Sequence, residues 1–565
     1  MEEKNGNVSR RAFLKGAMGA GAVVCAETVL AGCSRENSLE TPVAATGPSP
    51  SWRDAPDPID ESLISSTIDV DLVVVGAGVG GITAALTGIE EGASVLLVEK
   101  EEGLAAGSHW IGAVNTKYYL DKGVSYDRAA IVNDLMWHAS YRADQRLIQL
   151  WYDNSTEAVE WYLDRCTSDG SMSVMIELDQ KDTGGAHMSP SIAHVPILGT
   201  PTEMGPNESG LHYSNRILLD LAIANGLDYR DHTQALQLVQ DETGRVTGLV
   251  AENSEGYLLC NAAKGVILCT GGYIANEEMR EDLNPAQNAS SMAAAPVAPG
   301  CTGDGIKMAT WVGAALSDVH WWMDSDRGIL AGGNWRPGSQ PWLKLDCFGN
   351  RFCNEDAPYD YGAYAGSLCP GHVWWNVFDD NYWEALESYG TTICSRMYPK
   401  SGAVNSELVM HSKDEFYAEY IAPNIERGIM IEAPSLDDLA KAMKEQDDRL
   451  DPNIFEQSLQ RYNELCRKGV DEDFGKLPRR MKAVETGPFY AIQLTGSSIC
   501  TLDGIRINES INAIDKSGYP IEGLYLAGND QGGFYGMSYP WYYGGLNCGR
   551  TVTFARLAAK NALGA

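Results

Sequence analysis

The sequence lacks the basic charge and the cysteine motifs that mark several large protein classes. Its 565 residues include 43 Lys and Arg against 76 Asp and Glu, a formal net charge of −33. So acidic a chain is not expected to bind nucleic acid or an anionic membrane surface. None of its 13 cysteines forms a C-x-x-C pair. The spacing excludes a covalently attached haem and a compact four-cysteine iron–sulfur cluster, and no metal site is expected.

A long apolar run is also missing. The apolar stretch near the start, residues 16–32, is short and contains Glu27, so a stable membrane span is not expected. It follows Ser9-Arg10-Arg11-Ala12-Phe13-Leu14-Lys15, which resembles a twin-arginine export signal, and it ends in Leu30-Ala31-Gly32-Cys33, which resembles a bacterial lipobox. We expect residues 1–33 to be an export signal in which Cys33 is acylated; the alternative is ordinary cleavage there. Residues 34–65 are expected to tether the protein to the extracytoplasmic membrane face.

The chain does contain a nucleotide-binding pattern. Leu72 to Val75 predicts a buried parallel strand, and Gly76, Gly78 and Gly81 follow it with G-x-G-x-x-G spacing. These glycines permit a tight turn, close approach of a pyrophosphate and close packing of the next helix, which is expected to begin near Val79. A second strand over residues 94–98 ends at Glu99, where a carboxylate can accept the ribose hydroxyls. The order of these parts favours dinucleotide binding over a glycine-rich turn without a ligand.

Two distant segments favour FAD over NAD. One is Gly265 to Tyr273, a buried strand that runs into the turn Thr270-Gly271-Gly272. The other is Gly523 to Asp530, followed by Tyr543 to Arg550 and a helix to the C-terminus. A bipartite FAD domain needs both segments, and we expect one non-covalent FAD per chain. Its other expected contacts, in or beside these motifs, are Ala77, Gly80, Lys100, Gly107, Ser108, Asp304, Gly528, Asn529, Gly545 and Leu546.

With these motifs, residues 66–565 resemble the flavoprotein family that includes soluble fumarate reductase and 3-ketosteroid dehydrogenase. Thr302-Gly-Asp-Gly-Ile306 and Arg351-Phe-Cys-Asn-Glu355 also match it. The resemblance implies an α/β fold, in which a Rossmann-like bipartite FAD-binding domain carries an inserted, mobile α+β capping domain. The expected boundaries are 66–275 for the first part of the FAD domain, 276–435 for the capping domain and 436–565 for the second part.

The residues expected to hold substrate depart from the fumarate reductases. Where that family places its catalytic arginine, this chain has Tyr359, as ketosteroid dehydrogenases do. The carboxylate-binding arginine aligns with Tyr542, and a substrate histidine aligns near Cys500. Without a guanidinium or imidazole at these positions, bidentate recognition of a dicarboxylate is lost, so fumarate is not the expected substrate.

A second tyrosine completes the ketosteroid-like pattern. Gly536-Met-Ser-Tyr-Pro540 resembles the segment whose tyrosine binds the substrate carbonyl in those enzymes. By this resemblance, Tyr539 and a backbone amide near Gly544 or Gly545 would stabilise the developing enolate, and Tyr359 would protonate the α-carbon. Core packing is the alternative role for both tyrosines. Trp541, Tyr542 and Tyr543 are expected to shape an apolar pocket.

The sequence thus predicts an exported FAD-dependent oxidoreductase that reduces a C=C bond conjugated to a carbonyl in a bulky, apolar substrate. A tyrosine has an ordinary pKa of about 10 and starts as an acid, which favours reduction. One alternative is a ketosteroid-type dehydrogenase that runs the reverse reaction. Another is a surface flavoprotein that shuttles electrons and has no organic substrate. A separate FMN protein or cytochrome is expected to supply electrons.

Overall fold

The computed structural model describes residues 51–104, 110–176, 191–199, 211–291, 298–333, 335–357, 359–389 and 412–565. The expected signal and most of the expected tether, residues 1–50, lie outside this part of the chain, as do the candidate FAD contacts Gly107 and Ser108. Within it, no helix combines the length and the apolar character needed to cross a membrane.

A large sheet with a parallel centre forms the framework of the fold. Its main order is β15-β16-β9-β1-β2-β6, and β8 extends it from β9, with β7 beyond. The strands are β1 (Ile64–Val75), β2 (Val95–Val98), β6 (Asp228–Arg230), β7 (Gln234–Gln240), β8 (Val246–Asn253), β9 (Gly256–Leu268), β15 (Asn512–Ile514) and β16 (Pro520–Leu526). The last residues of β1 and all of β2 are buried, as expected for central parallel strands. The predicted strands around residues 72–75, 94–98 and 265–268 are confirmed.

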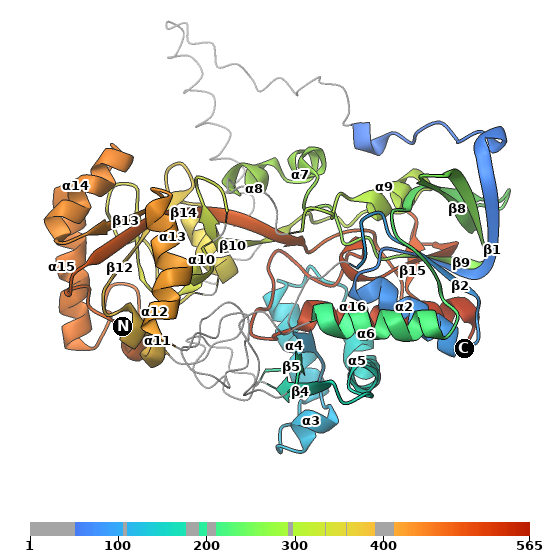
Figure 1. Ribbon diagram of the computed structural model, residues 1–565, viewed down its shortest axis with the longest axis horizontal. Coiled ribbons are helices and arrows are strands. Elements are labelled where there is room, and N and C mark those ends of the chain that lie inside the picture. The colour runs from blue at the N-terminus through green and yellow to red at the C-terminus, as the bar shows by residue number, and fades with distance from the viewer. Residues whose placement is uncertain are drawn as a thin grey trace, which may run out of the picture. The chain divides into compact units, whose positions relative to one another are not determined.

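Helices from both ends of the described chain cover this sheet. α2 (Val79–Glu90) begins at the glycine loop, as predicted, and packs against α16 (Leu546–Leu563), the predicted C-terminal helix. α16 also packs on α5 (Gln145–Cys166), and α2 on α6 (Leu211–Ala224), as Figure 1 shows. The fold therefore joins the first and last segments of the dinucleotide domain directly.

The inserted region is built around an antiparallel sheet of β10 (Trp322–Ile329), β11 (Leu343–Asp346), β12 (Val373–Asp379), β13 (Met430–Ala433) and β14 (Phe489–Thr501). Alternate side chains of β12 enter two different apolar cores, Trp374 and Phe378 on one face and Trp375 and Val377 on the other. This is the two-residue period of a strand. α14 (Leu436–Gln446) and α15 (Pro452–Lys468) bury Leu439, Met443 and Leu459 in the second of these cores.

The remaining elements are shorter or connect these layers. A small antiparallel sheet has the order β3-β5-β4, with β3 (Ile111–Gly112), β4 (Met172–Ile176) and β5 (Ala193–Leu198). The other helices are α3 (Lys117–Leu120), α4 (Arg128–His138), α7 (Glu277–Leu283), α8 (Pro285–Ser290), α9 (Asp304–Trp311), α10 (Tyr359–Gly366), α11 (Tyr382–Tyr389), α12 (Lys413–Phe416), the π-helical turn Tyr417–Ile421 and α13 (Ala422–Glu426).

Two boundaries differ from the sequence-based expectation. The sequence places the return to the FAD domain at residue 436, but α14 and α15 pack on the inserted sheet, and β15 is the first strand back in the large sheet. The amphipathic pattern predicts these helices but does not say which sheet their apolar face covers. Near the start, the expected tether is already docked at Trp52, whose buried indole lies in the main core and whose carbonyl accepts from Trp311 Nε1 at 3.0 Å.

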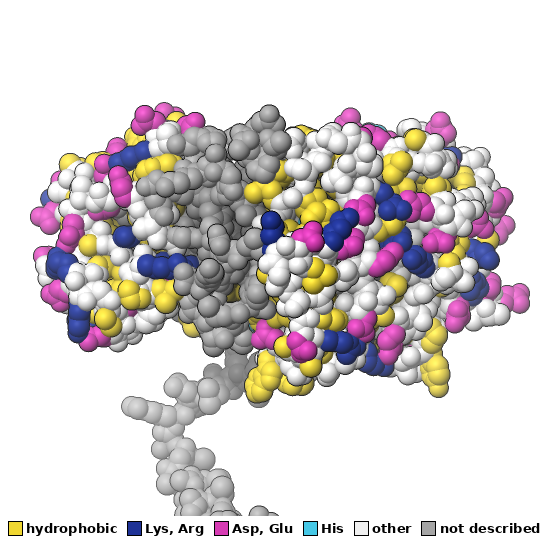
Figure 2. Space-filling model, turned by 90° about the horizontal axis from the view of Figure 1, so that it is seen from below, with side chains coloured by type: hydrophobic (Ala, Val, Ile, Leu, Met, Phe, Trp, Pro, Cys, Tyr) yellow, Lys and Arg dark blue, Asp and Glu magenta, His cyan; other side chains and the backbone are white. Residues whose placement is uncertain are grey.

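The surface carries both signs of charge. On the face drawn in Figure 2, acidic and basic side chains of the described residues lie side by side, with apolar side chains between them. That face therefore presents no extended patch of a single charge for electrostatic capture of a polyanion.

Candidate functional site

The glycine loop between β1 and α2 has the geometry that a pyrophosphate requires. Gly76 has a φ of +96°, and a Cβ there would approach the carbonyl of Cys269. A Cβ on Gly81 would collide with the carbonyl oxygen of Gly76, so only glycine lets α2 approach β1 this closely. A Cβ on Gly78 would meet no atom within 4 Å. The open side of the loop therefore lies at Gly78, at the N-terminus of α2, where a phosphate is favoured.

Glu99 lies directly against this loop. Its carboxylate accepts from Ala77 N–H at 2.7 Å and from Glu101 N–H at 3.0 Å, and the side chain is buried. The next residue, Lys100, reaches across to the start of α9, where its Nζ lies 2.6 Å from Thr302 Oγ1 and 2.8 Å from Asp304 Oδ2. The structure thus places Glu99 beside the loop, and the contacts of Lys100 with Thr302 and Asp304 join the end of β2 to the start of α9.

The turn after β9 is held by a carboxylate to which the sequence analysis assigned no role. Asp530 accepts from Thr270 N–H at 2.5 Å, from Thr270 Oγ1 at 2.9 Å and from Gly272 N–H at 2.9 Å. Gly271 and Gly272 both have positive φ values, which the turn requires. Burial raises the pKa of Asp530 to about 6, although these donors oppose the shift. Its place directly after the Gly528-Asn529 motif is the only sequence signal for this role.

The start of α16 gathers several predicted residues. Gly545 is the left-handed N-cap, and its carbonyl accepts from Gly112 N–H at 2.8 Å. The Tyr539 hydroxyl accepts from Asn547 N–H at 3.2 Å, so the predicted carbonyl-binding tyrosine does lie at this helix terminus. Behind it, the buried Arg550 donates to side-chain oxygens of Asn529, Gln531 and Asn547, and so connects the Gly528-Asn529 segment to the helix.

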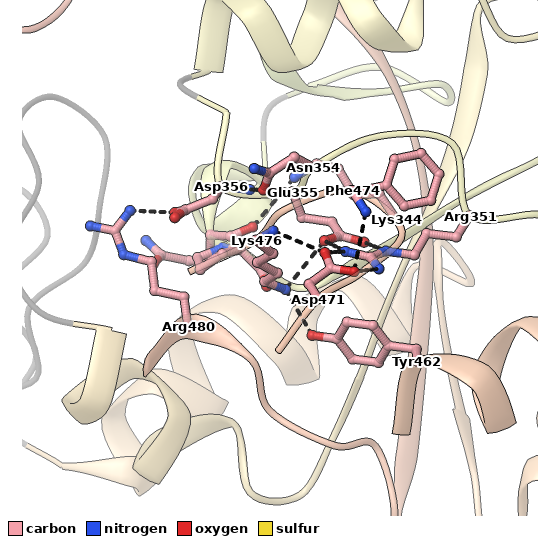
Figure 3. A network of polar contacts seen from close by, with 12 residues as sticks. Lys344, Arg351, Asn354, Glu355, Asp356, Tyr462, Asp471, Phe474, Lys476 and Arg480 are labelled. Carbon is pink, nitrogen blue, oxygen red and sulfur yellow. Dashed lines mark hydrogen bonds and ion pairs between the residues drawn. The ribbon is translucent and has the colours of Figure 1, made fainter. Parts of the chain in front are cut away.

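The capping segment that precedes α10 is fixed by a buried ionic network (Figure 3). Arg351 makes paired hydrogen bonds to Glu355 at 2.7 and 2.8 Å and to Asp471 at 2.9 and 2.7 Å. Burial alone would raise the pKa of Glu355, but Lys476 and Arg351 lower it overall. Further along, Arg480 pairs with Asp356. The family motif Arg351 to Glu355 thus holds the backbone that leads into α10.

α10 begins at Tyr359, and the structure describes only the backbone of that residue. Two residues further along α10, the Tyr361 hydroxyl shares a hydrogen bond with Nε2 of His138 on α4. Nδ1 of His138 lies 3.3 Å from Ser538 Oγ, directly before Tyr539. The sequence analysis assigns no role to His138 or to Tyr361, which lies two residues after the predicted Tyr359.

The aromatic residues before α16, which are predicted to shape a pocket, are buried. Trp541, Tyr542 and Tyr543 are all at most 7% exposed. The Tyr543 hydroxyl donates to Asp134 Oδ2 at 2.8 Å, and the ring of Tyr542 meets the edge of His138 with centroids 5.6 Å apart. Asp134 and His138 of α4 therefore contact the aromatic side chains of Tyr543 and Tyr542.

The sequence from residue 71 to residue 541 matches the family described as FAD binding domain. The chain belongs to this family. It is a flavoprotein oxidoreductase that uses FAD, and the glycine loop, Glu99 and the turn at Thr270 fit that cofactor. FAD, when bound, supplies hydride chemistry.

Curated relatives span most of this FAD-binding chain. The vinyl phenol reductase of Lactiplantibacillus plantarum is 28% identical over 508 residues, which cover 85% of this chain and 95% of that protein. The digoxin reductase of Eggerthella lenta is 26% identical over an alignment that covers 98% of this chain and 96% of that protein. A 3-oxosteroid 1-dehydrogenase of Mycolicibacterium smegmatis is 29% identical over 56% of each chain.

Solved structures show the same fold. A flavocytochrome c3 fumarate reductase in its open conformation aligns with a TM-score of 0.66 and 22% identity, and covers 91% of this chain and 82% of its own. The 3-ketosteroid Δ1-dehydrogenase of Sterolibacterium denitrificans aligns with the same TM-score and 19% identity. The alignment covers 88% of this chain and 100% of that protein. The expected bipartite FAD fold with an inserted domain is confirmed.

Proposed function

We propose that this flavoprotein reduces a carbon–carbon double bond conjugated to a carbonyl group. The observation that carries the proposal is the position of the Tyr539 hydroxyl at the N-terminus of α16, where it accepts from Asn547 N–H. A phenol that accepts a hydrogen bond becomes a better donor, and the helix dipole favours negative charge at the same place. A carbonyl oxygen that turns into an enolate is the ligand this arrangement suits.

The residues around Tyr539 support an apolar substrate. The ring of Tyr535 packs against Tyr539 with centroids 5.6 Å apart, and Trp541 and Tyr542 are buried beside it. Several relatives are named after reduction of compounds with a conjugated double bond, such as vinyl phenol and urocanate. The 3-oxosteroid 1-dehydrogenase among the relatives keeps the reverse reaction as the alternative.

In the proposed reaction, FAD, when bound and reduced, would supply the hydride that the β-carbon needs. Tyr539 and a backbone amide near Gly544 or Gly545 hold the carbonyl oxygen as negative charge develops on it. An acid at the start of α10, where the sequence predicts Tyr359, then protonates the α-carbon. We further propose that the protein is exported, anchored through Cys33 and supplied with electrons by a separate FMN protein or cytochrome.

The first test is a panel of unsaturated carbonyl compounds, from small enoates to bulky enones, assayed anaerobically with reduced viologen. Saturated counterparts with an artificial acceptor test the reverse direction. We expect turnover of bulky enones in the reductive direction. Rapid reduction of the flavin without turnover of any compound would instead favour an electron-shuttling role and overturn the proposal.

Tyr539→Phe tests the carbonyl contact with the substrate that the panel identifies. Loss of one oxyanion donor costs about 10²–10³-fold in kcat, and we expect a drop on that scale with FAD content unchanged. Tyr535→Phe is the matched control, because the Tyr535 hydroxyl has no hydrogen-bond partner among the described residues. Equal activity in the two variants would leave Tyr539 with a packing role only.

A further inference from the structure

The end of α4 and the turn that follows it expose two large aromatic side chains. Trp137 is 71% exposed and Tyr141 is 58% exposed, and their rings meet edge to face with centroids 6.1 Å apart. A single exposed aromatic side chain is ordinary, but a contacting pair is typical of a surface that binds another molecule. Trp, Tyr and Arg also dominate the binding energy of protein interfaces.

The backbone of this turn is strained, and the strain presents Tyr141 to solvent. Ser140 and Tyr141 have φ values of +52° and +56°, in the left-handed region that a bulky residue rarely adopts. The amide of Tyr141 donates to the Met136 carbonyl at 2.8 Å, which fixes the turn. Glycine would adopt this conformation at lower cost, so a tyrosine here gains nothing for the fold. Strain of this kind is typical of functional sites.

A pocket of about 280 Å³ opens beside the exposed rings. Tyr141 lines it, together with three arginines, Arg142, Arg146 and Arg506. Arg146 forms an ion pair with Asp144. The side chains of Arg142 and Arg506 make no hydrogen bond among the residues that the structure describes. The pocket therefore offers two guanidinium groups whose donors are available to a ligand.

The acidic groups that line the pocket do not match these arginines. Asp144 caps the start of α5 and is bound by an arginine of the same helix. Asp503 accepts from Tyr273 at 2.8 Å and pairs with His320. Asp318 is exposed and is the remaining carboxylate in the lining. An anionic group is therefore the ligand that complements the pocket.

This surface adjoins the loop that carries Tyr539. A Cβ on Gly536 would approach the carbonyl oxygen of Ala139 to 2.4 Å, so the loop lies directly on the turn after α4. Gly533, shortly after Asp530 of the FAD site, lines the pocket and accepts from the Asp144 amide at 2.7 Å. A molecule bound at the pocket therefore lies beside the segments that form the cofactor site.

We propose that the protein that supplies electrons to the flavin binds at this surface, which consists of Trp137, Tyr141, Arg142, Arg146 and Arg506. The inference rests on the proposed function and assigns a docking surface to its separate electron donor. The sequence has no haem-attachment motif and no compact iron–sulfur motif, so the electrons come from another molecule. Each turnover takes two electrons from the reduced donor, which is oxidised, and the two protons that the saturated product gains come from solvent.

The size of the pocket indicates how such a donor would bind. A volume of about 280 Å³ lies just below the range of sites that enclose a cofactor-sized ligand. It suits a single acidic side chain or a haem propionate of the donor, with the aromatic rings of Trp137 and Tyr141 covered by the surrounding protein surface. The proposed donor therefore presents an acidic group near its own redox centre.

The experiment separates electrons that require docking from electrons that do not. Reduced viologen is small and needs no protein interface, whereas living cells must use their own donor. Trp137→Ser, Tyr141→Gly and Arg142→Glu each replace the wild type in cells that carry the gene, and reduction of a panel compound is measured. We expect each variant to lower the cellular rate about 10-fold or more, as loss of an interface hot spot does, with FAD content and viologen-driven kcat unchanged.

Two controls make the same chemical changes elsewhere on the surface. Tyr519 is 71% exposed and Arg427 is exposed on the inserted region, so Tyr519→Ser and Arg427→Glu should keep the wild-type cellular rate. Tyr141→Gly supplies a further check, because glycine suits the positive φ at this position. Its unfolding midpoint should stay level or rise, whereas loss of a packing residue would lower it.

The outcomes distinguish the two proposals. Wild-type cellular rates in all three variants overturn the inference and leave the proposed function in place. The inference also fails if viologen-driven kcat falls in step with the cellular rate, or if size-exclusion chromatography or membrane fractionation shows that the variants lose a dimer or a membrane contact. A purified wild type that turns over no compound of the panel overturns the proposed function, and the inference with it.

Discussion

At the scale of single residues, burial raises the pKa of two carboxyl groups, Asp530 and Asp360, by different amounts. Asp530 receives three hydrogen bonds from the turn at Thr270, and so holds a loop of the FAD site. Asp360, at the start of α10, has backbone donors near its carboxyl group, that of Tyr539 among them, but they do not offset the cost of burying its charge. Burial raises the pKa of Asp360 to about 8. Such a group is favoured in its neutral form.

This difference predicts a pH dependence of stability. The folded protein keeps the Asp360 proton up to about pH 8, whereas an unfolded chain loses it near a pKa of about 3.9. A raised folded-state pKa means that stability falls as pH rises between these values, by up to about 1.4 kcal/mol per pH unit. We expect Asp360→Asn to reduce this slope most clearly between pH 6 and pH 8, because Asp530, with a pKa of about 6, contributes to it mainly at lower pH. Urea unfolding at pH 5, 6, 7 and 8 measures it.

The exposed Asp121 supplies the control. Asp121→Asn should show the same change of unfolding free energy with pH as the wild type. If Asp360→Asn also keeps the wild-type slope, Asp360 is ionised in the folded protein and the prediction is wrong.

At the scale of elements, the glycine loop separates a residue needed for packing from one that faces the ligand. Gly81 lets α2 approach β1, because a Cβ there would collide with the Gly76 carbonyl. Gly78 has ordinary negative φ and open space around its Cβ position. The two substitutions to alanine should therefore fail for different reasons.

We expect Gly78→Ala to fold normally but to bind FAD weakly, because its methyl group would occupy the space left for the pyrophosphate. Gly81→Ala should lower the unfolding midpoint of the apoprotein as well. Flavin released from denatured, desalted protein measures occupancy, and thermal unfolding of the apoproteins measures the fold. Full FAD content in Gly78→Ala would show that the pyrophosphate does not approach this position.

The ionic network drawn in Figure 3 connects elements of the inserted region through buried charges. Arg351 is 7% exposed and neutralises the side chains of Glu355 and Asp471, which are fully buried. Removing one partner of a buried ion pair typically costs about 3–5 kcal/mol, so Arg351→Met should strongly destabilise the inserted region. Chemical denaturation followed by tryptophan fluorescence measures the loss, because several buried tryptophans lie around the inserted sheet, among them Trp335, Trp342, Trp374 and Trp375.

A surface ion pair provides the comparison. Arg128 bridges Asp153 at 2.7 Å with both side chains about half exposed, and exposed pairs contribute little to stability. Arg128→Met should leave the midpoint nearly unchanged. If Arg351→Met and Arg128→Met change the unfolding midpoint equally, the Arg351 network contributes little to stability and serves only to fix the positions of the residues that it joins.

At the scale of the whole molecule, one chain assembles its FAD site from segments that are hundreds of residues apart. The loop at Gly76, the turn at Thr270 and the start of α16 meet because the large sheet places β1, β9 and β16 side by side. The inserted region then brings Tyr361 to His138 across a separation of 223 residues.

The proposed location is tested on the full chain. Replacement of Arg10 and Arg11 by lysine should retain precursor in the cytoplasm, because a twin-arginine signal requires both guanidinium groups. Cys33→Ala should release the protein from membranes, since several acyl chains hold a lipoprotein where one alone binds weakly. Fractionation and immunoblotting measure both. A wild-type protein found wholly in the soluble fraction would contradict the anchor.

Local sequence was sufficient to predict the elements whose conformation depends on residues close to one another in the chain. The strand before Gly76, the helix from Val79 and the glycine spacing were all predictable, because strand burial, turn geometry and helix starts are properties of short segments. The family resemblance added the bipartite domain and the position of Tyr539 near α16.

Local sequence patterns could not predict the contacts between segments that are distant in the chain. An amphipathic helix shows that it has an apolar face but not which sheet receives it, so the return to the FAD domain was expected too early. Three contacts of this kind are Trp52 with the main core, Asp530 with the turn at Thr270, and His138 with Tyr361. Each forms because the strand order and the inserted region bring distant segments together. A hydrogen bond needs atoms within about 3 Å of each other, and the folded path of the chain is what sets that distance.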